Sequence, residues 1–311
     1  MRITLFILFL IVSTALPPMA QAQSVNCTSS MSDIVFGTVS LRSGVSNQTS
    51  GTLSINCTGV GSIGVCIVLA SGSGGSGAGF SPRFMRRADS AALAYELRPG
   101  GNGASGGTWD REFVRVPTVL GTGRIDVPVF ADITSSGVGT GTGAYSTTFS
   151  GTAQAHIEFN TNSCNQPGTV RQINAFDVTA DVAASCEVDA GAIDFGTLAA
   201  AAVTSTVAAT GGFVIRCTQG TGYTVSLDNG VGAGASGPTD RRMTGPASQQ
   251  LRYGLYLNGS VTTPWGQTPG QTVATTGTGN DQTMTVHGRL FAGQPLRAGV
   301  YTDSVLITVE Y

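Results

Sequence analysis

The chain has 311 residues, including 44 glycines, with only 11% charged residues and a formal net charge of −2. All 16 basic residues are arginines, scattered apart from the pairs Arg86-Arg87 and Arg241-Arg242, so the concentrated positive charge that nucleic-acid binding needs is missing. No segment keeps a 3.6-residue apolar period, and the abundant glycine, serine, threonine and valine predict an all-β fold with many turns.

The first 22 residues have the organisation of a secretory signal peptide. Arg2 precedes an apolar run from Ile3 to about Leu16, and the small residues Ala20 and Ala22 follow it. The run is short for a membrane anchor, which needs about 20 apolar residues. We therefore predict cleavage after Ala22 and export of the mature chain, whose length fits two domains better than one.

An internal repeat divides the mature chain. The segment CTSSMSDIVFGTVS from Cys27 matches CEVDAGAIDFGTLA from Cys186, and RFMRRADSAALAYELRPGG matches DRRMTGPASQQLRYGLYLNGS. Further on, Trp109 matches Trp265, and GAYSTTFSGTAQAHIEF matches AGVYTDSVLITVEY. Because order and spacing agree along the whole unit, we predict two related β domains, over residues 23–183 and 184–311.

Six cysteines in an exported chain predict disulfides. A metal site is less well supported, because there is no CxxC pair and the two histidines, His156 and His287, lie far apart in strand-like runs. The repeat favours bridges at equivalent positions, which leaves one bridge specific to the first copy. The expected pairs are Cys27–Cys57, Cys186–Cys217 and Cys66–Cys164.

Residues 176–182, FDVTADV, alternate between apolar and polar side chains, which predicts a half-buried strand. The apolar face consists of Phe176, Val178, Ala180 and Val182. The repeat favours assigning this strand to the N-terminal domain, because the first copy continues past Phe159 whereas the second has no counterpart after Tyr311. The alternative is that it opens the C-terminal domain.

An ordered set of segments in the second copy resembles the spore coat protein U family. These segments are IDFGTL (193–198), IRCTQGTGYTVSLDNG (215–230), RRMTG (241–245), LRYGLYLNGS (251–260) and the terminal AGVYTDSVLITVEY. The resemblance covers 184–311 and is weaker, though in register, over 27–159. The family supplies subunits of archaic chaperone–usher pili. The resemblance implies two tandem immunoglobulin-like β-sandwiches, the C-terminal one lacking its last strand and exposing an apolar groove.

The resemblance also implies partners for that groove. A periplasmic chaperone, and then the N-terminal strand of an adjacent subunit, would fill it by donor-strand complementation, and an outer-membrane usher would export the assembly. The expected groove residues are Val305, Ile307, Val309 and Tyr311, and residues 176–182 would complete the N-terminal domain in cis. Only Gln23 to Asn26 precede Cys27 after cleavage, too few for a donor strand. We therefore expect a tip subunit of a cell-surface pilus that mediates attachment and biofilm formation.

Four loops are specific to the first copy: 59–66, 71–82, 116–123 and 135–145. Their apolar residues are expected to touch abiotic or biological surfaces, unless they cover the ends of the sandwich. The residues are Ile63, Phe80, Val119, Leu120 and Val138. Glycan binding is the alternative, in which Trp109 stacks on a sugar ring, although its repeat partner Trp265 favours a shared structural position.

Enzyme-like strings also occur in the first copy. GNGASG (101–106) and GASGG (103–107) lack the strand before and the helix after that phosphate binding or a nucleophile elbow requires. The acids considered for glycoside hydrolysis are Asp110, Glu112, Asp126 and Asp132. No acid–base pair can be identified among them. We predict no enzymatic activity, no cofactor and no metal, with a lectin-like β-sandwich as the main alternative and a glycoside-acting enzyme as the weaker one.

Overall fold

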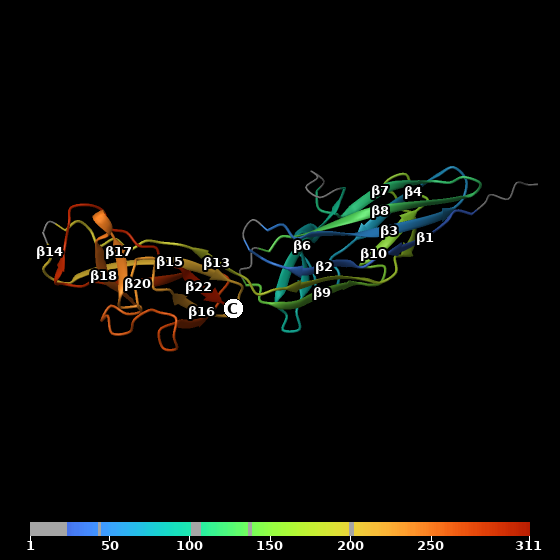
Figure 1. Ribbon diagram of the computed structural model, residues 1–311. Helices are drawn as coiled ribbons and strands as arrows, with labels where there is room; N and C mark the ends of the chain where they lie inside the picture. Colours follow the sequence, from blue (N-terminus) through green and yellow to red (C-terminus); the bar gives the residue numbers. More distant parts are fainter. Residues whose placement is uncertain (1–23, 43–44, 101–106, 136–138, 199–201) are drawn as a thin grey trace, which may run out of the picture.

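The computed structural model describes residues 24–42, 45–100, 107–135, 139–198 and 202–311, so the predicted signal peptide lies outside the described residues. The described chain consists of strands and loops, with two short 3-10 turns, η1 (Ala78–Phe80) and η2 (Pro246–Ser248). The all-β prediction is therefore confirmed. Among the described residues, no helix has the length and apolar character needed to cross a membrane. The strands form two domains that lie end to end (Figure 1).

The N-terminal domain is a sandwich of two sheets. Across the larger sheet the order is β1 (Asn26–Met31), β3 (Gln48–Thr58), β8 (Thr122–Ile133), β6 (Ala92–Pro99), β5 (Arg83–Arg86), β9 (Gly143–Phe149), β12 (Phe176–Val182) and β2 (Ile34–Val39). The smaller sheet has the order β11 (Thr169–Gln172), β10 (Ala155–Phe159), β4 (Ser62–Leu69) and β7 (Arg111–Pro117). Alternate residues of both sheets point inward and form one apolar core.

The C-terminal domain repeats this plan with fewer strands. One sheet has the order β13 (Cys186–Asp189), β15 (Val207–Cys217), β20 (Gln282–Leu290), β18 (Gln250–Tyr256) and β17 (Arg241–Thr244). The facing sheet has the order β19 (Val273–Thr276), β16 (Gly222–Leu227) and β22 (Ile307–Glu310). A further pair joins β14 (Ala202–Val203) to β21 (Gln294–Pro295). A separate apolar core lies between these sheets.

Three disulfides have the pairing that the repeat favoured. Cys27 and Cys57 face each other across β1 and β3, and Cys186 and Cys217 face each other across β13 and β15. Cys66 on β4 is joined to Cys164 in the loop after β10. In the chain-entropy account, each bridge stabilises its domain by about 2–4 kcal/mol, because it restricts the unfolded chain.

A buried arginine at the same repeat position joins the two sheets of each domain. The Arg83 guanidinium of β5 donates to the carbonyl oxygens of Leu69 and Ala70, at the end of β4, and to that of Trp109. Its repeat partner Arg241 of β17 donates to the matching carbonyls of Leu227, Asp228 and Trp265. Both arginines are fully buried. Hydrogen bonds from a charged donor offset part of the desolvation cost of such burial.

Strand β12 belongs to the N-terminal domain. It pairs along its whole length with β9, antiparallel, from Phe176 opposite Phe149 to Val182 opposite Gly143. On its other side it runs parallel to β2. Phe176, Val178, Ala180 and Val182 are all buried, and the Phe176 ring stacks on that of Phe149 with centroids 4.7 Å apart. The chain thus closes its own first sandwich, and the alternative assignment of this strand to the C-terminal domain is wrong.

We expect the Arg83→Met substitution to lower the free energy of unfolding of the N-terminal domain by about 3 kcal/mol, because three buried carbonyls lose a charged donor. Arg115→Met is the matched control, since Arg115 is exposed and lies over the Phe113 ring. It should cost less than about 1 kcal/mol. Denaturant unfolding of the full chain measures both. Equal losses would contradict a structural role for the buried guanidinium.

We expect Val178→Ala to destabilise the N-terminal domain by about 2 kcal/mol, because it removes fully buried methyl groups from β12. Asp181→Ala, on the exposed face of the same strand, should change the stability by less than about 0.5 kcal/mol. The measurement is denaturant unfolding with hydrogen exchange resolved by domain. If the two variants behaved alike, β12 would not be contributing its apolar face to the core.

Candidate functional site

In the C-terminal domain, the position that corresponds to β12 lies beside a segment with few backbone partners. The repeat aligns β9 with residues 299–305 and β2 with residues 193–198. Neither segment forms a strand, and no described strand lies between them. A single bridge, Thr302 opposite Thr244, matches the Ser146–Arg86 bridge of the first copy. The C-terminal sandwich is therefore open at the edge that β12 closes in the N-terminal domain.

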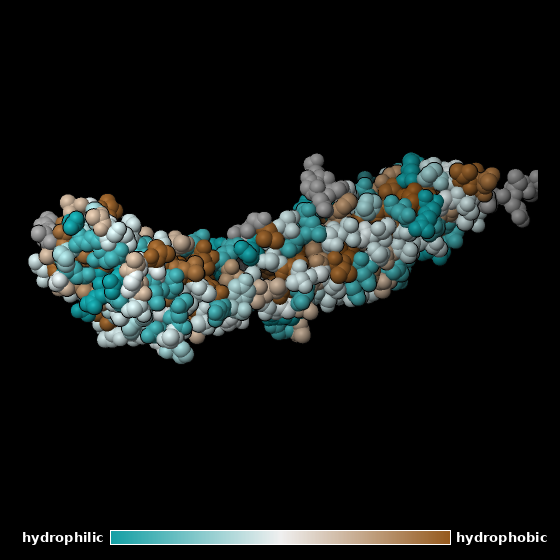
Figure 2. Space-filling view, in the orientation of Figure 1, coloured by the Kyte–Doolittle hydropathy of each residue, from teal (hydrophilic) through white to brown (hydrophobic). Residues whose placement is uncertain are grey.

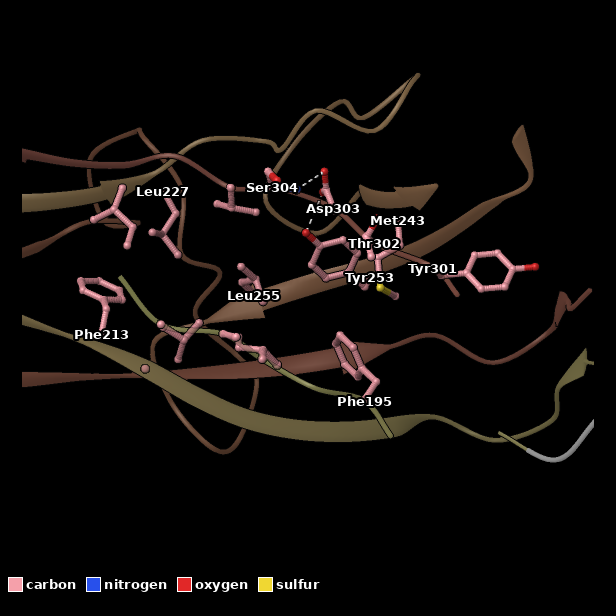
Figure 3. Close-up of a pocket in the computed structure, with 17 residues that line it drawn as sticks. Phe195, Phe213, Leu227, Met243, Tyr253, Leu255, Tyr301, Thr302, Asp303 and Ser304 are labelled. Carbon is pink, nitrogen blue, oxygen red and sulfur yellow. Dashed lines mark hydrogen bonds between the residues drawn. The ribbon is translucent and has the colours of Figure 1, made fainter. Parts of the chain in front are cut away.

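An apolar groove lies along this open edge (Figure 3). One cavity of about 390 Å³ and a second of about 770 Å³ share Ile193, Phe195, Met243 and Tyr301 in their walls, so they adjoin one another. The first extends toward the core and the second toward the 296–300 loop. The residues that line only the first include Phe213, Leu227, Tyr253, Leu255, Val286 and Val305.

The two copies differ in burial at matched positions. In the N-terminal domain Ile34, Tyr145 and Phe149, on the strands paired with β12, and Met85 on β5 are fully buried. Their repeat partners are Ile193, Met243, Tyr301 and Val305, all of which are only half-buried. Sequence position and side-chain type are similar, and what differs is the strand that covers them. The groove is therefore core surface that the described C-terminal domain leaves uncovered.

Asp303 places a carboxylate in the first of the two cavities. The Asp303 Oδ2 atom accepts a hydrogen bond from the Tyr253 hydroxyl at 2.7 Å (Figure 3). Its Oδ1 atom accepts from the backbone N–H groups of Val231, Gly232 and Ser304 at 2.9, 3.1 and 2.8 Å. Burial and then the hydrogen bond to Asp303 raise the pKa of Tyr253, so the phenol remains a donor.

The expected groove residues lie only partly in the groove. Val305 and Ile307 line it. Val309 lies opposite Val225 within the facing sheet, and Tyr311 is exposed. The last two assignments are corrected, because the terminal segment corresponds to both β9 and β10 of the first copy. The part that matches β9, together with Ile307 at the start of β22, borders the opening. Sequence reasoning missed Tyr301 and Asp303, although the match of Tyr301 with Tyr145 was a usable signal.

The predicted surface residues of the N-terminal domain have different environments. Ile63 lies inside β4 and is buried, so its assignment to a contact loop is wrong; it packs in the sandwich core. Phe80 is half-buried, with the Arg83 guanidinium 5.8 Å from its ring centroid. Val119 and Leu120 are exposed in the β7–β8 turn. Val138 lies outside the described residues.

The exposed turn joins a second apolar loop at the end of the domain far from the junction. The Gly59 N–H donates to the Gly121 carbonyl at 2.9 Å, and the Thr118 N–H donates to the Gly61 carbonyl at 2.8 Å. Val60, between these glycines, is also exposed. Figure 2 shows apolar side chains gathered at this end of the molecule. Val60, Val119 and Leu120 are called the distal apolar cluster below.

The residues considered for catalysis and sugar stacking are in structural positions. Trp109 and Trp265 are both buried, which confirms their shared packing role and removes Trp109 as an exposed stacking platform. Asp126 accepts hydrogen bonds from Ser54 and Arg124, which lower its pKa, and Asp132 is paired with Arg98. The lowered pKa of Asp126 makes that carboxyl a poor proton donor. His156 and His287 lie in β10 and β20, as expected.

The remaining acids and the glycine-rich strings form no recognisable catalytic or metal-binding cluster among the described residues. Asp110 and Glu112 lie at the start of β7, and residues 101–106 lie outside the described residues. Over the described part of the chain, no group of three or more His, Cys, Asp or Glu side chains is arranged to hold a metal ion. The groove is therefore the site developed below.

Comparison with known proteins shows which family has this organisation. The family model for the spore coat protein U domain matches residues 13–152 and again 172–308. Protein U of Myxococcus xanthus is 28% identical over 144 residues, which cover 42% of this chain and 80% of that protein.

A solved structure has a similar fold. It is a chain of the CsuC–CsuE complex, a pre-assembly complex of a chaperone and a tip adhesion subunit from the archaic chaperone–usher Csu pili of Acinetobacter baumannii. The match has 16% identity and a TM-score of 0.52, and it covers 91% of this chain and 100% of that one. Since the family model matches both halves of the sequence, the chain belongs to the spore coat protein U domain family, with two copies of the domain in tandem.

Proposed function

We propose that the chain is a structural and adhesive subunit of a surface pilus, and that its C-terminal groove accepts a β-strand from another protein. The observation that carries this proposal is a comparison between the two copies of the domain within the chain. In the first copy of the same domain, β12 fills the equivalent place, antiparallel to β9 and parallel to β2. The groove of the second copy has matching walls, so an extended strand with alternating apolar residues is the occupant that fits it.

The identity of the occupant follows from pairing and from family membership. An open edge beside half-buried core residues is a template for strand addition and for aggregation. In the CsuC–CsuE complex a chaperone is bound to a tip adhesion subunit before assembly. By analogy, we propose that a periplasmic chaperone covers the groove first and that the donor strand of an adjacent subunit replaces it. An outer-membrane usher would export the assembled chain to the cell surface.

The N-terminal domain would then be the outer, adhesive part. It is already completed by β12, so it needs no strand from a partner, which suits the tip position. The loops that carry its distal apolar cluster, before β4 and between β7 and β8, lie at the end farthest from the domain junction (Figure 1). We propose that this cluster makes the first contact with a surface during attachment and biofilm formation. The role is structural and adhesive, and no catalytic step is proposed.

The strand-binding role predicts opposite outcomes for neighbouring substitutions. Val305→Asp places a charge in the groove wall and should abolish co-purification with the cognate chaperone, because an unpaired charge against apolar side chains is costly. Leu306→Asp places the same charge on the exposed side of the same segment and should retain the complex. Pull-down from periplasmic extract measures both. Chaperone binding that survives Val305→Asp would show that another surface is used.

The adhesive role predicts that Leu120→Asn reduces attachment without destabilising the fold. Leu120 and Gly121 both have positive φ, at 54° and 84°, in a two-residue hairpin turn where asparagine is preferred over leucine. The variant should be at least as stable as the parent, yet it removes a fully exposed apolar side chain. Val170→Asn, an exposed valine on β11, is the control.

The measurements are thermal unfolding of the chain and attachment of cells to polystyrene and to glycan-coated plates. If attachment falls on polystyrene but not on glycan-coated plates, the result supports apolar contact. A loss confined to glycans would favour a lectin-like domain, and unchanged attachment after replacement of the whole cluster would contradict the adhesive role.

A further inference from the structure

The groove edge of the C-terminal domain is held by two carboxylates that the first copy does not have. Asp303 occupies the repeat position of Thr147, and Asp228 that of Ala70. In the first copy the Thr147 hydroxyl accepts one backbone N–H, that of Gly74, at 2.8 Å. In the second copy Asp303 accepts from both Val231 and Gly232, and the latter is the partner of Gly74.

Asp228 fixes the other end of the same segment. Its Oδ1 atom accepts from the backbone N–H of Leu306 at 2.9 Å and from that of Gly230 at 2.9 Å. Its own N–H donates to the Leu306 carbonyl at 3.1 Å. The methyl side chain of Ala70 cannot accept the first two bonds. The Ala70 N–H does donate to the carbonyl of Gln154, which occupies the repeat position of Leu306. The backbone contact is thus kept in both copies, and the carboxylate is an addition.

These additions occur on the copy whose edge has no strand beside it. In the first copy, seven residues of β9 are held in an extended form by pairing with β12. The matching segment, 299–305, has no such pairing among the described residues. Hydrogen bonds to a carboxylate are stronger than those to a neutral acceptor, so two aspartates can hold the backbone where a neighbouring strand does not.

We propose that Asp303 and Asp228 are positioning residues, which hold the edge at residues 303–306 in place before an incoming strand pairs with it. The inference rests on the proposed strand-binding function and adds how the site is prepared for its partner. A pre-formed edge lowers the entropy that must be lost when a strand binds, and so raises affinity. The occupant is an extended peptide with apolar side chains at alternate positions, in the register of β12.

The test uses a synthetic peptide with the sequence of residues 174–184, NAFDVTADVAA, which contains the strand that closes the first copy. Its binding to the full mature chain is measured by fluorescence anisotropy. The decisive variant is Asp228→Ala, because Asp228 does not line the groove and its carboxylate contacts only the backbone N–H groups of Leu306 and Gly230. We expect affinity to fall by about tenfold, since one charged hydrogen bond to the edge is lost.

Asp303→Ala tests the same role from inside the groove. If the carboxylate merely occupied apolar space, the Asp303→Ala chain should bind the peptide more tightly than the parent. If Asp303 is a positioning residue, the variant should bind it more weakly. Asp303→Asn, which keeps an acceptor oxygen for Val231 and Gly232, should restore most of the affinity. Thr147→Ala, the matched change in the closed N-terminal domain, should leave peptide binding unchanged. Hydrogen exchange at Val231, Gly232 and Leu306 reports loss of the edge contacts directly.

The outcomes separate the inference from the function on which it rests. Peptide binding that is equal in the parent, Asp228→Ala and Asp303→Ala chains would overturn the positioning role and leave strand binding intact. A parent chain that binds neither this peptide nor a chaperone would contradict both. A peptide in which Val178→Ser and Val182→Ser remove the apolar face is the specificity control and should not bind.

Discussion

The structure of the C-terminal domain depends on one constraint: a sheet edge beside a core needs a neighbouring strand. Residues 299–305 lie along such an edge, and the side chains behind them are only half-buried. In the N-terminal domain the same constraint is met by β12, which supplies both backbone partners and a row of buried apolar side chains. Backbone pairing and side-chain burial occur together, because a strand that pairs with β9 points every second side chain into the core.

The duplication makes this comparison unusually direct. Met85 and Met243, and Tyr145 and Tyr301, are matched residues in matched frameworks. Each is buried where β12 is present and half-buried where no strand covers it. The difference cannot come from composition, since the side chains are identical. It comes from connectivity, because the first copy is followed by an amphipathic strand that folds back onto it, and that strand leads directly into β13 of the second.

Much of the fold was predictable because its signals are local or repeated. The alternation of FDVTADV predicted a strand, and the repeat indicated the disulfide pairs and the shared position of Trp109 and Trp265.

The details of the contact loops and of the groove were less accessible. Ile63 appeared to be in a loop because glycines flank it, yet β4 continues through it and buries it. The placing of Val309 and Tyr311 failed because alternation identifies the face of a strand, not which of two consecutive strands borders an opening. Asp303 was missed because its hydrogen bonds from Val231 and Gly232 join residues more than 70 positions apart.

An open groove requires the rest of the sandwich to keep its shape without the closing strand. Arg241 on β17 meets this requirement, because it donates to the carbonyls of Leu227, at the end of β16, and of Trp265, and so joins the two sheets through the interior. Arg83 makes the equivalent contacts in the domain that is closed. Since neither set of bonds involves the position of β12, the sheets are held together independently of that strand. Asp228 and Asp303 then bond to the backbone of Leu306, Val231 and Gly232, to which Arg241 does not donate. Under the proposed function, these contacts let the C-terminal domain present an ordered edge to an incoming strand.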